Sequence, residues 1–219
     1  MWMEGSTSGV YRMWFQHMDI NRISFYQYNT IIVGTGAAGL NAAVTLHKLG
    51  QKNIALITEG RYMGTSRNTG SDKQTYYKMT QCGSEPDSVR KMAKTLFEGG
   101  CVDGDIAMAE AAGSLRAFYH LVDIGVPFPF NKSGEYVGYK TDHDPLKRGI
   151  SAGPLTSKYM TECLERQAEE RGIPFFDGYQ AVRLLTEEKN GEKWAAGIIA
   201  LNKQKAASPD ERYAVFSAV

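Results

Sequence analysis

The feature that most constrains the fold is a short turn with three glycines at fixed spacing. Gly34, Gly36 and Gly39 form a G-x-G-x-x-G pattern between the apolar run Thr30 to Val33 and the alanine-rich run Leu40 to Leu49. This pattern is typical of a strand that turns into a helix. The first glycine of the turn takes backbone angles that residues with a Cβ rarely adopt. The second lets a pyrophosphate approach the main chain, and the third lets the helix pack closely on the strand. The pattern predicts a dinucleotide whose phosphates lie at the helix N-terminus.

The glycine pattern alone is weak evidence, because an ordinary turn before a helix is the alternative. The flanking residues favour the binding motif. Helical spacing relates Ala42, Ala43 and Leu46, Gly50 ends the helix, and Ile54 to Ile57 supplies a second apolar strand. The sequence therefore predicts a βαβ unit and an α/β fold.

Composition restricts the class of protein. The 219 residues are 42% hydrophobic and 22% charged, as in a globular protein of one large domain or, less readily, two small ones. A net charge of +1 argues against a nucleic-acid or membrane partner. No apolar run reaches the length of a transmembrane segment, and Cys82, Cys101 and Cys163 lack the spacing of a metal or redox motif. We therefore expect unpaired thiols and a cytoplasmic protein.

The N-terminal residues 1–28 are interpreted as an extension of unknown structure that precedes a domain over 29–219. The segment is aperiodic at its start, and Met18 followed by Asp19 resembles a natural start for a domain whose first strand lies near Thr30. An upstream extension or a misassigned start is the hypothesis that follows.

The loop Thr58 to Gln81 is rich in Gly, Thr, Ser and Asn. Loops of this length inside a compact domain are uncommon unless they bind something, although a solvated surface loop is the alternative. Two helices are expected next. Ser84 is the predicted N-cap of the first, with acids in its first turn, and Asp103 to Asp123 forms the second. Their expected core faces are Val89, Met92, Ala93 and Leu96, and Met108, Ala111, Leu115, Phe118 and Val122.

Charged residues gather in the irregular segment Gly125 to Gly153. His143 lies between Asp142 and Asp144, which suits acid–base or metal chemistry, but neighbouring side chains in a loop diverge, so a solvated turn is favoured. Lys147 and Arg148 are candidates to bind a phosphate or carboxylate.

The last part of the chain changes from helix to strand. Pro154 opens a predicted helix over Leu155 to Glu170, and a short strand follows at Ile173 to Phe176. Asn190-Gly191 between two β-rich runs is a strong hairpin signal. We predict a three-stranded antiparallel meander over Ala181 to Thr186, Trp194 to Leu201 and Arg212 to Val219.

The order of these motifs resembles the flavoprotein subunit family of fumarate reductases, succinate dehydrogenases and L-aspartate oxidases. It is carried by GTGAAGL, AAVTL, the Gly-Thr-Ser-rich loop, a helix beginning GPLTSKYM, and the meander, over about Thr30 to Val219. The resemblance implies a Rossmann-like FAD-binding domain of the glutathione-reductase type, a parallel sheet plus an antiparallel β-meander. It also implies an oxidoreductase that moves a hydride between flavin and a small organic acid.

The resemblance also assigns residues to FAD. It puts the pyrophosphate on the glycine-rich turn and the ribose on an acid at the end of the second strand. Glu59 has the spacing expected of that acid, about 20 residues after the last glycine. Aligning the strands puts Thr58 in that place instead. Neighbouring strand side chains point to opposite faces, so one of the two is expected to bind, and we favour Glu59. Membrane-complex members of the family bind FAD covalently through a histidine in the Gly-Thr-Ser-rich loop. Residues 58–81 contain no histidine, so the resemblance implies non-covalent FAD. The implied contacts are Gly34, Gly36, Ala37, Ala38, Gly39, Thr58, Glu59, Thr65, Ser66, Gly70, Ser71 and Ala181.

The sequence departs from the family after the meander, where relatives continue with a further strand and a capping domain that holds most substrate-binding residues. The 219 residues are thus expected to be the N-terminal portion of a longer flavoenzyme, inactive by itself. Two alternatives stay open: a non-catalytic dinucleotide-binding module, and an NAD(P)-binding Rossmann dehydrogenase.

Overall fold

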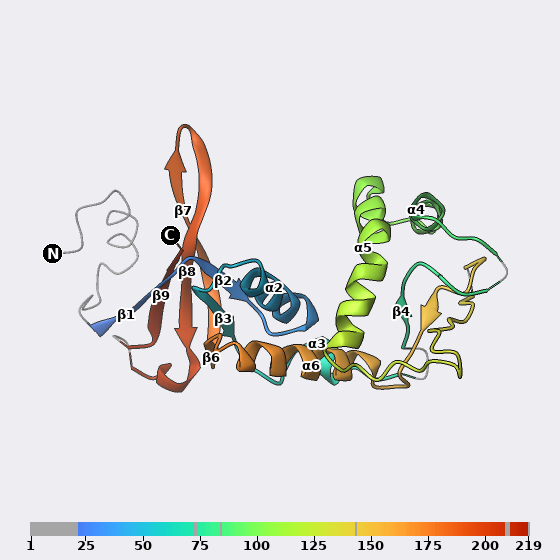
Figure 1. Ribbon diagram of the computed structural model, residues 1–219. Helices are drawn as coiled ribbons and strands as arrows, with labels where there is room; N and C mark the ends of the chain where they lie inside the picture. Colours follow the sequence, from blue (N-terminus) through green and yellow to red (C-terminus); the bar gives the residue numbers. More distant parts are fainter. Residues whose placement is uncertain (1–21, 72–73, 84, 143, 209–210, 219) are drawn as a thin grey trace. The chain divides into compact units, whose positions relative to one another are not determined.

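The computed structural model describes residues 22–71, 74–83, 85–142, 144–208 and 211–218 (Figure 1). The start at Met18 and Asp19 that the sequence suggested lies outside these residues. The described chain forms two compact units, one from residues 22–65 with 165–218, the other from Ser66–Leu164. The second unit is therefore inserted into the chain of the first.

A parallel sheet forms the centre of the first unit. It has the order β2-β3-β6, from strands Thr30–Val33, Ile54–Thr58 and Phe175–Asp177. Every residue of β3 is buried, which explains its uninterrupted apolar sequence. Helix α2, Ala37–Lys48, packs on β2 and β3 through the buried Leu40, Ala43 and Val44, and the predicted βαβ unit is confirmed.

A second sheet has the order β1-β9-β8-β7. Strands β7, Tyr179–Lys189, β8, Glu192–Asn202, and β9, Tyr213–Ala218, form the predicted antiparallel meander. Asn190 and Gly191 have φ of 55° and 80°, the positive values that a tight hairpin turn needs. Strand β1, Ser24–Tyr28, pairs in parallel with β9, although the sequence indicated no strand before Thr30.

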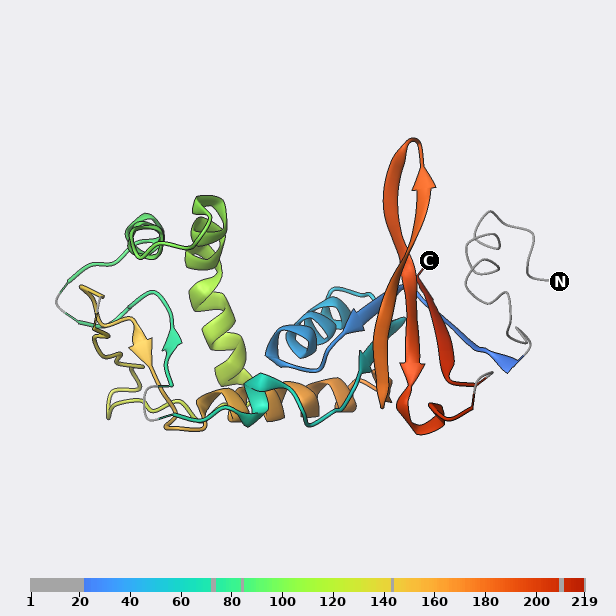
Figure 2. The same cartoon turned by 180° about the vertical axis from the view of Figure 1, so that it is seen from behind.

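The core of the first unit lies between the two sheets. Ala55 and Ile57 of the parallel sheet pack against residues of β8 and β9, and the Tyr26 and Phe216 rings stack at 4.9 Å between centroids. Helix α2 lies on the other side of β2 and β3, as both views show (Figures 1 and 2). The carboxyl ends of β2 and β3 thus emerge from a rigid three-layer scaffold. The buried members of this core are Ala55, Ile57, Ile198, Ala200, Ala214 and Phe216.

The second unit contains two packed helices, α4, Val89–Glu98, and α5, Gly104–Asp123. The predicted N-cap Ser84 lies outside the described residues, and the helix begins later than expected: Ser88 caps it and accepts a hydrogen bond from Lys91 N at 3.1 Å. No acid lies in the first turn of α4, contrary to the prediction.

The core face of α4 was predicted correctly, with Met92 and Ala93 buried against Ala107 and Ala111 of α5. The predicted face of α5 was only partly correct. Ala111 and Phe118 are buried, but Met108 is exposed, because the face that meets α4 is displaced by one residue. The buried positions of α5 are Ala107, Ala111, Ser114, Phe118 and Leu121.

Two short strands and two further helices belong wholly or in part to the second unit. Strands β4, Tyr76–Tyr77, and β5, Gly149–Ile150, pair antiparallel, and the short helix α3, Thr65–Asn68, begins at the boundary between the units. Helix α6, Thr156–Glu170, begins two residues after Pro154 and continues into residues of the first unit.

Candidate functional site

The glycine-rich turn has the geometry that its spacing predicted at two of its three glycines. Gly34 has φ of 100°, which L side chains rarely adopt. A Cβ on Gly39 would lie 2.1 Å from Gly34 O and 3.4 Å from Ile32 Cγ2. Gly39 therefore lets the first turn of α2 pack against the end of β2.

Gly36 needs a different explanation. It is the N-cap of α2 with φ of −77° and ψ of −179°, angles that any residue adopts. Its missing side chain is therefore not required by its own backbone angles. Ala37 and Ala38 follow in a first helical turn without acidic residues, so no carboxylate opposes an anion at this end of the helix dipole.

Two neighbouring residues at the end of β3 have different surroundings. Thr58 is buried, accepts a hydrogen bond from Thr35 Oγ1 at 3.1 Å and donates to Gly60 O at 3.3 Å. The side chain of Glu59 is 45% exposed, and its Oε1 accepts from Lys203 Nζ at 2.9 Å. The Thr58 hydroxyl thus serves the turn itself, whereas the Glu59 carboxylate lies at the surface.

The chain after Glu59 is held by Arg61. Its guanidinium lies 4.1 Å from the Phe175 ring centroid and forms ion pairs with Glu165 and Glu169, while its backbone N donates to Asp177 Oδ1 at 2.8 Å. These contacts fix the path of the chain at the carboxyl end of β3.

The hydroxyl-rich loop is held by the start of α6. Thr65 and Ser66 open α3, and Ser71 N donates to Pro154 O at 3.1 Å. A Cβ on Gly70 would lie 3.2 Å from the same oxygen. Gln74 donates to Ser157 Oγ at 2.7 Å and accepts from Ser157 N at 2.9 Å. Ser66, Gly70 and Ser71 belong to the second unit and are described within it.

Ala181 lies on β7 of the first unit, where it pairs with Ala200. The register shifts between Ala181 and Arg183, so the strand is locally irregular where the resemblance places the adenine ring.

The charged segment before β5 has a structural role. Arg148 is fully buried, and its Nη2 and Nε donate to the two Asp87 carboxylate oxygens at 2.7 and 2.8 Å. Arg148 thus meets a carboxylate, one of the two partners that the sequence suggested, and that carboxylate belongs to the protein itself. His143 lies outside the described residues, and among those that are described no three His, Cys, Asp or Glu side chains gather as a metal site.

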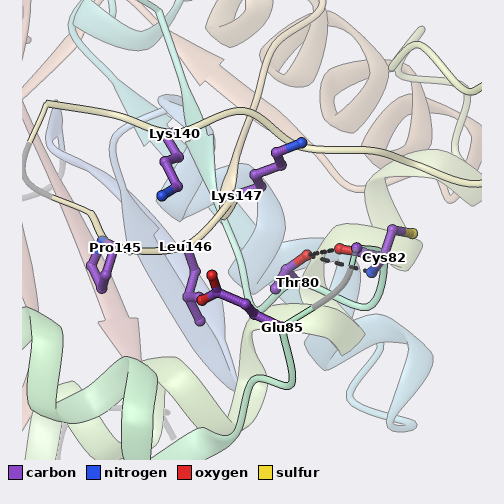
Figure 3. A pocket seen from close by; sticks show the side chains of 8 residues that line it. Thr80, Cys82, Glu85, Lys140, Pro145, Leu146 and Lys147 are labelled. Carbon is purple, nitrogen blue, oxygen red and sulfur yellow. Dashed lines mark hydrogen bonds between the residues drawn. The ribbon is translucent and has the colours of Figure 1, made fainter.

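Lys147 lines a small cavity of the second unit, of about 70 Å³, together with Lys140, Glu85 and Leu146 (Figure 3). None of its lining residues comes from the glycine-rich turn. Its volume is well below the several hundred Å³ typical of a cofactor pocket.

Sequence reasoning missed Thr35 and Lys203 at this site. Thr35 lies between two of the glycines, and its hydroxyl bonds the end of the neighbouring strand. Lys203 is 144 residues from Glu59 in the chain, and no local pattern indicates such a pair.

A strand, glycine turn and helix beside a second strand with an acid at its end define a dinucleotide-binding α/β protein. The chain matches the family of the FAD binding domain over residues 29–217 and belongs to that family. Its cofactor is FAD, and the nicotinamide alternative is disfavoured. The glycine turn, with no Cβ at its three key positions, fits the FAD pyrophosphate.

Individual relatives agree with this family. The chain is 33% identical to the 8-methylmenaquinol:fumarate reductase flavoprotein subunit of Wolinella succinogenes over 179 residues, which are 80% of this chain and 29% of that protein. It is 28% identical to the L-aspartate oxidase of Pseudomonas aeruginosa over 195 residues, 82% of this chain and 34% of the relative. The chain thus spans about a third of the length of the curated relatives it matches.

Solved structures show the same fold. Mycobacterium smegmatis Sdh1, solved in complex with UQ1, has a TM-score of 0.75 at 16% identity, covering 90% of this chain and 33% of that one. The Escherichia coli quinol fumarate reductase FrdA gives 0.72 at 19% identity, with 90% and 32% covered. The predicted fold class is confirmed. Among the helices of the described ranges, none has the length and apolar character needed to cross a bilayer.

Proposed function

We propose that this chain is the cofactor-binding part of an oxidoreductase whose full-length form transfers a hydride between FAD and a small organic acid. The observation that carries the proposal is the glycine-rich turn, whose backbone fits a pyrophosphate, in a chain of the FAD-binding family. Relatives named as fumarate reductase and L-aspartate oxidase support a small acid as substrate. When bound, FAD would supply the hydride acceptor or donor.

Different residues of the chain would contact different parts of FAD. Amides of the glycine-rich turn, Gly34, Gly36, Ala37, Ala38 and Gly39, would hold the pyrophosphate at the positive end of the α2 dipole. Glu59 would accept hydrogen bonds from the adenosine ribose, in preference to the internally bonded Thr58. Ala181 would meet the adenine ring through its backbone. The flavin would lie against Thr65, Ser66, Gly70 and Ser71, without a covalent bond.

The three cysteines support a reducing compartment, and we propose a cytoplasmic location on that basis. Cys82, Cys101 and Cys163 are all unpaired, as expected where thiols are kept reduced.

The test of the cofactor site is Gly36→Val. The backbone angles of Gly36 allow valine, so we expect a folded protein. It should lose FAD, because the new side chain would occupy the space that the proposed site gives to the pyrophosphate. The measurement is flavin absorbance that remains with the protein after gel filtration.

The matched control is Gly113→Ala. A Cβ at Gly113 on α5 would have no neighbour within 4 Å, so this variant should keep its FAD. Flavin retention by Gly36→Val equal to that of the parent would refute the site. A parent protein that takes up no flavin would support the non-catalytic module instead.

A further inference from the structure

The side chain of Lys203 extends toward Glu59 from a turn that is held by hydrogen bonds. Lys203 opens the 3-10 helix η2, Lys203–Lys205, and its backbone N donates to Gly178 O at 2.9 Å. The preceding Asn202 is buried and caps this turn by accepting from Gln204 N at 3.1 Å, while its Nδ2 donates to Tyr179 OH at the same distance. The backbone at Lys203 is thus fixed where β7 begins and β8 ends.

The ion pair between Lys203 and Glu59 is expected to add little to the stability of the fold. The side chains of Lys203 and Glu59 are 43% and 45% exposed, and ion pairs in such positions contribute little to folding. The contact instead fixes the orientation of one carboxylate. Ionised carboxylates have about four acceptor sites on two oxygens, so an ammonium on Oε1 leaves capacity for further donors.

We propose that Lys203 is a positioning residue for the adenosine ribose: its ammonium group holds the Glu59 carboxylate in the orientation that accepts hydrogen bonds from the ribose hydroxyls. This inference rests on the proposed function, in which Glu59 faces the ribose. Lys203 itself touches Glu59 and reaches the nucleotide only through it. The role is therefore to sharpen recognition of the 2′-hydroxyl rather than to add general affinity for phosphates.

The test compares ADP with 2′-deoxy-ADP, two ligands that differ in that hydroxyl alone. Isothermal titration calorimetry on the 219-residue chain gives the ratio of their dissociation constants. A hydrogen bond to a charged group predicts a preference for ADP of about tenfold in the parent. In Lys203→Met this preference should fall by at least about threefold, because an unoriented carboxylate bonds the hydroxyl less well.

The same turn offers a matched control. Lys205 pairs with Glu211 at 3.3 Å and does not contact Glu59, so Lys205→Met removes the same charge without removing the orientation. This variant should keep the parent ratio. Lys203→Arg, which keeps the charge, should recover part of the preference. If Lys203 acts through Glu59, Lys203→Met should have no further effect in a Glu59→Gln background.

The outcomes separate this inference from the proposed function. A parent that binds FAD, with an unchanged ratio in Lys203→Met or an equal loss in Lys205→Met, overturns the role of Lys203 alone. A parent that binds neither FAD nor ADP overturns the proposed function and this inference with it. Melting curves of each variant verify folding, and the Lys203→Arg ratio decides the question if Lys203→Met does not fold.

Discussion

At the scale of single residues, each glycine of the turn lacks a side chain for its own reason. Gly34 has a positive φ, and a Cβ on Gly39 would meet the Gly34 carbonyl oxygen. Gly36 has backbone angles that any residue adopts. Substitution should therefore separate folding from binding: a side chain at Gly36 acts on the ligand, and one at Gly39 acts on the protein first.

Gly39→Ala should destabilise the protein by about 1–3 kcal/mol, the usual cost of overpacking. The methyl group would lie 2.1 Å from Gly34 O, a backbone atom that moves only if the turn itself shifts. The free energy of unfolding from urea titration measures the loss. Gly113→Ala is the control, since it adds a methyl group in open space and improves helix propensity. Equal stability of Gly39→Ala and the parent would contradict the close contact.

The choice between Thr58 and Glu59 shows where sequence reasoning ends at this scale. Spacing from the last glycine and strand alignment pointed to different residues. What distinguishes them is burial and a hydrogen bond between Thr58 and Thr35, which is 23 residues earlier in the chain. Local spacing contains no information on that contact.

At the scale of helices and strands, a buried ion pair joins the start of α4 to β5. Arg148 and Asp87 are both fully buried and meet through two hydrogen bonds. Arg148 Nη1 also donates to Thr95 Oγ1 at 2.9 Å and to Tyr77 OH at 3.1 Å. Burial raises the pKa of Tyr77 to about 12, so this phenol stays neutral at ordinary pH.

The pair predicts a specific loss of stability in acid. Burial alone would raise the pKa of Asp87, but hydrogen bonds from Arg148, Thr80 and Ser88 outweigh it, and the pKa is lowered below its usual value of 3.8. A lowered pKa in the folded state contributes stability that is fully present above the unfolded pKa, near 4, and is lost as pH falls through the folded value. Urea unfolding of the parent between about pH 6 and pH 2.5 should show this decline.

In Asp87→Asn the decline should be shallower. Stability at pH 7 should be lower because Arg148 then loses its bidentate charged partner and keeps only Asp144, whose Oδ1 lies 3.4 Å from Nη1. Lys94 and Glu98 form an exposed pair on the same helix, and Glu98→Gln is the control that should leave both unchanged. An identical acid decline in Asp87→Asn and the parent would show that another group titrates there.

The same pair explains why the start of α4 was misjudged. Ser84 fitted the N-cap pattern, and the acids after it suited a first helical turn. Asp87 is instead held outside the helix by Arg148, 61 residues later in the chain. The βαβ unit and the meander were predictable because their signals are local, whereas β1 was not, because its partner is the last strand described.

At the scale of the whole molecule, cofactor binding should be visible as stability. A ligand that binds only the folded state at about 100 times its dissociation constant adds about 2.7 kcal/mol. For a chain of this length that corresponds to a rise in Tm of roughly 5–10 °C. The measurement is the unfolding of the parent with and without FAD, followed by circular dichroism.

The control for this prediction is Gly36→Val, whose Tm should not respond to FAD. A rise of equal size in that variant would mean that FAD stabilises the protein from somewhere other than the glycine-rich turn. An unchanged Tm in the parent would contradict the cofactor site and support the non-catalytic module instead.

The pairing of β1 with β9 has a consequence for the order in which the chain acquires structure during synthesis. Beside these strands, Arg22 and Glu211 form an ion pair across 189 residues of chain. The inserted second unit, Ser66–Leu164, is contiguous and can begin to fold on the ribosome as soon as it emerges. The first unit has to wait for β8 and β9, so β1 and β2 leave the exit tunnel with their apolar faces uncovered. During that interval the uncovered apolar surface makes the nascent chain prone to aggregation.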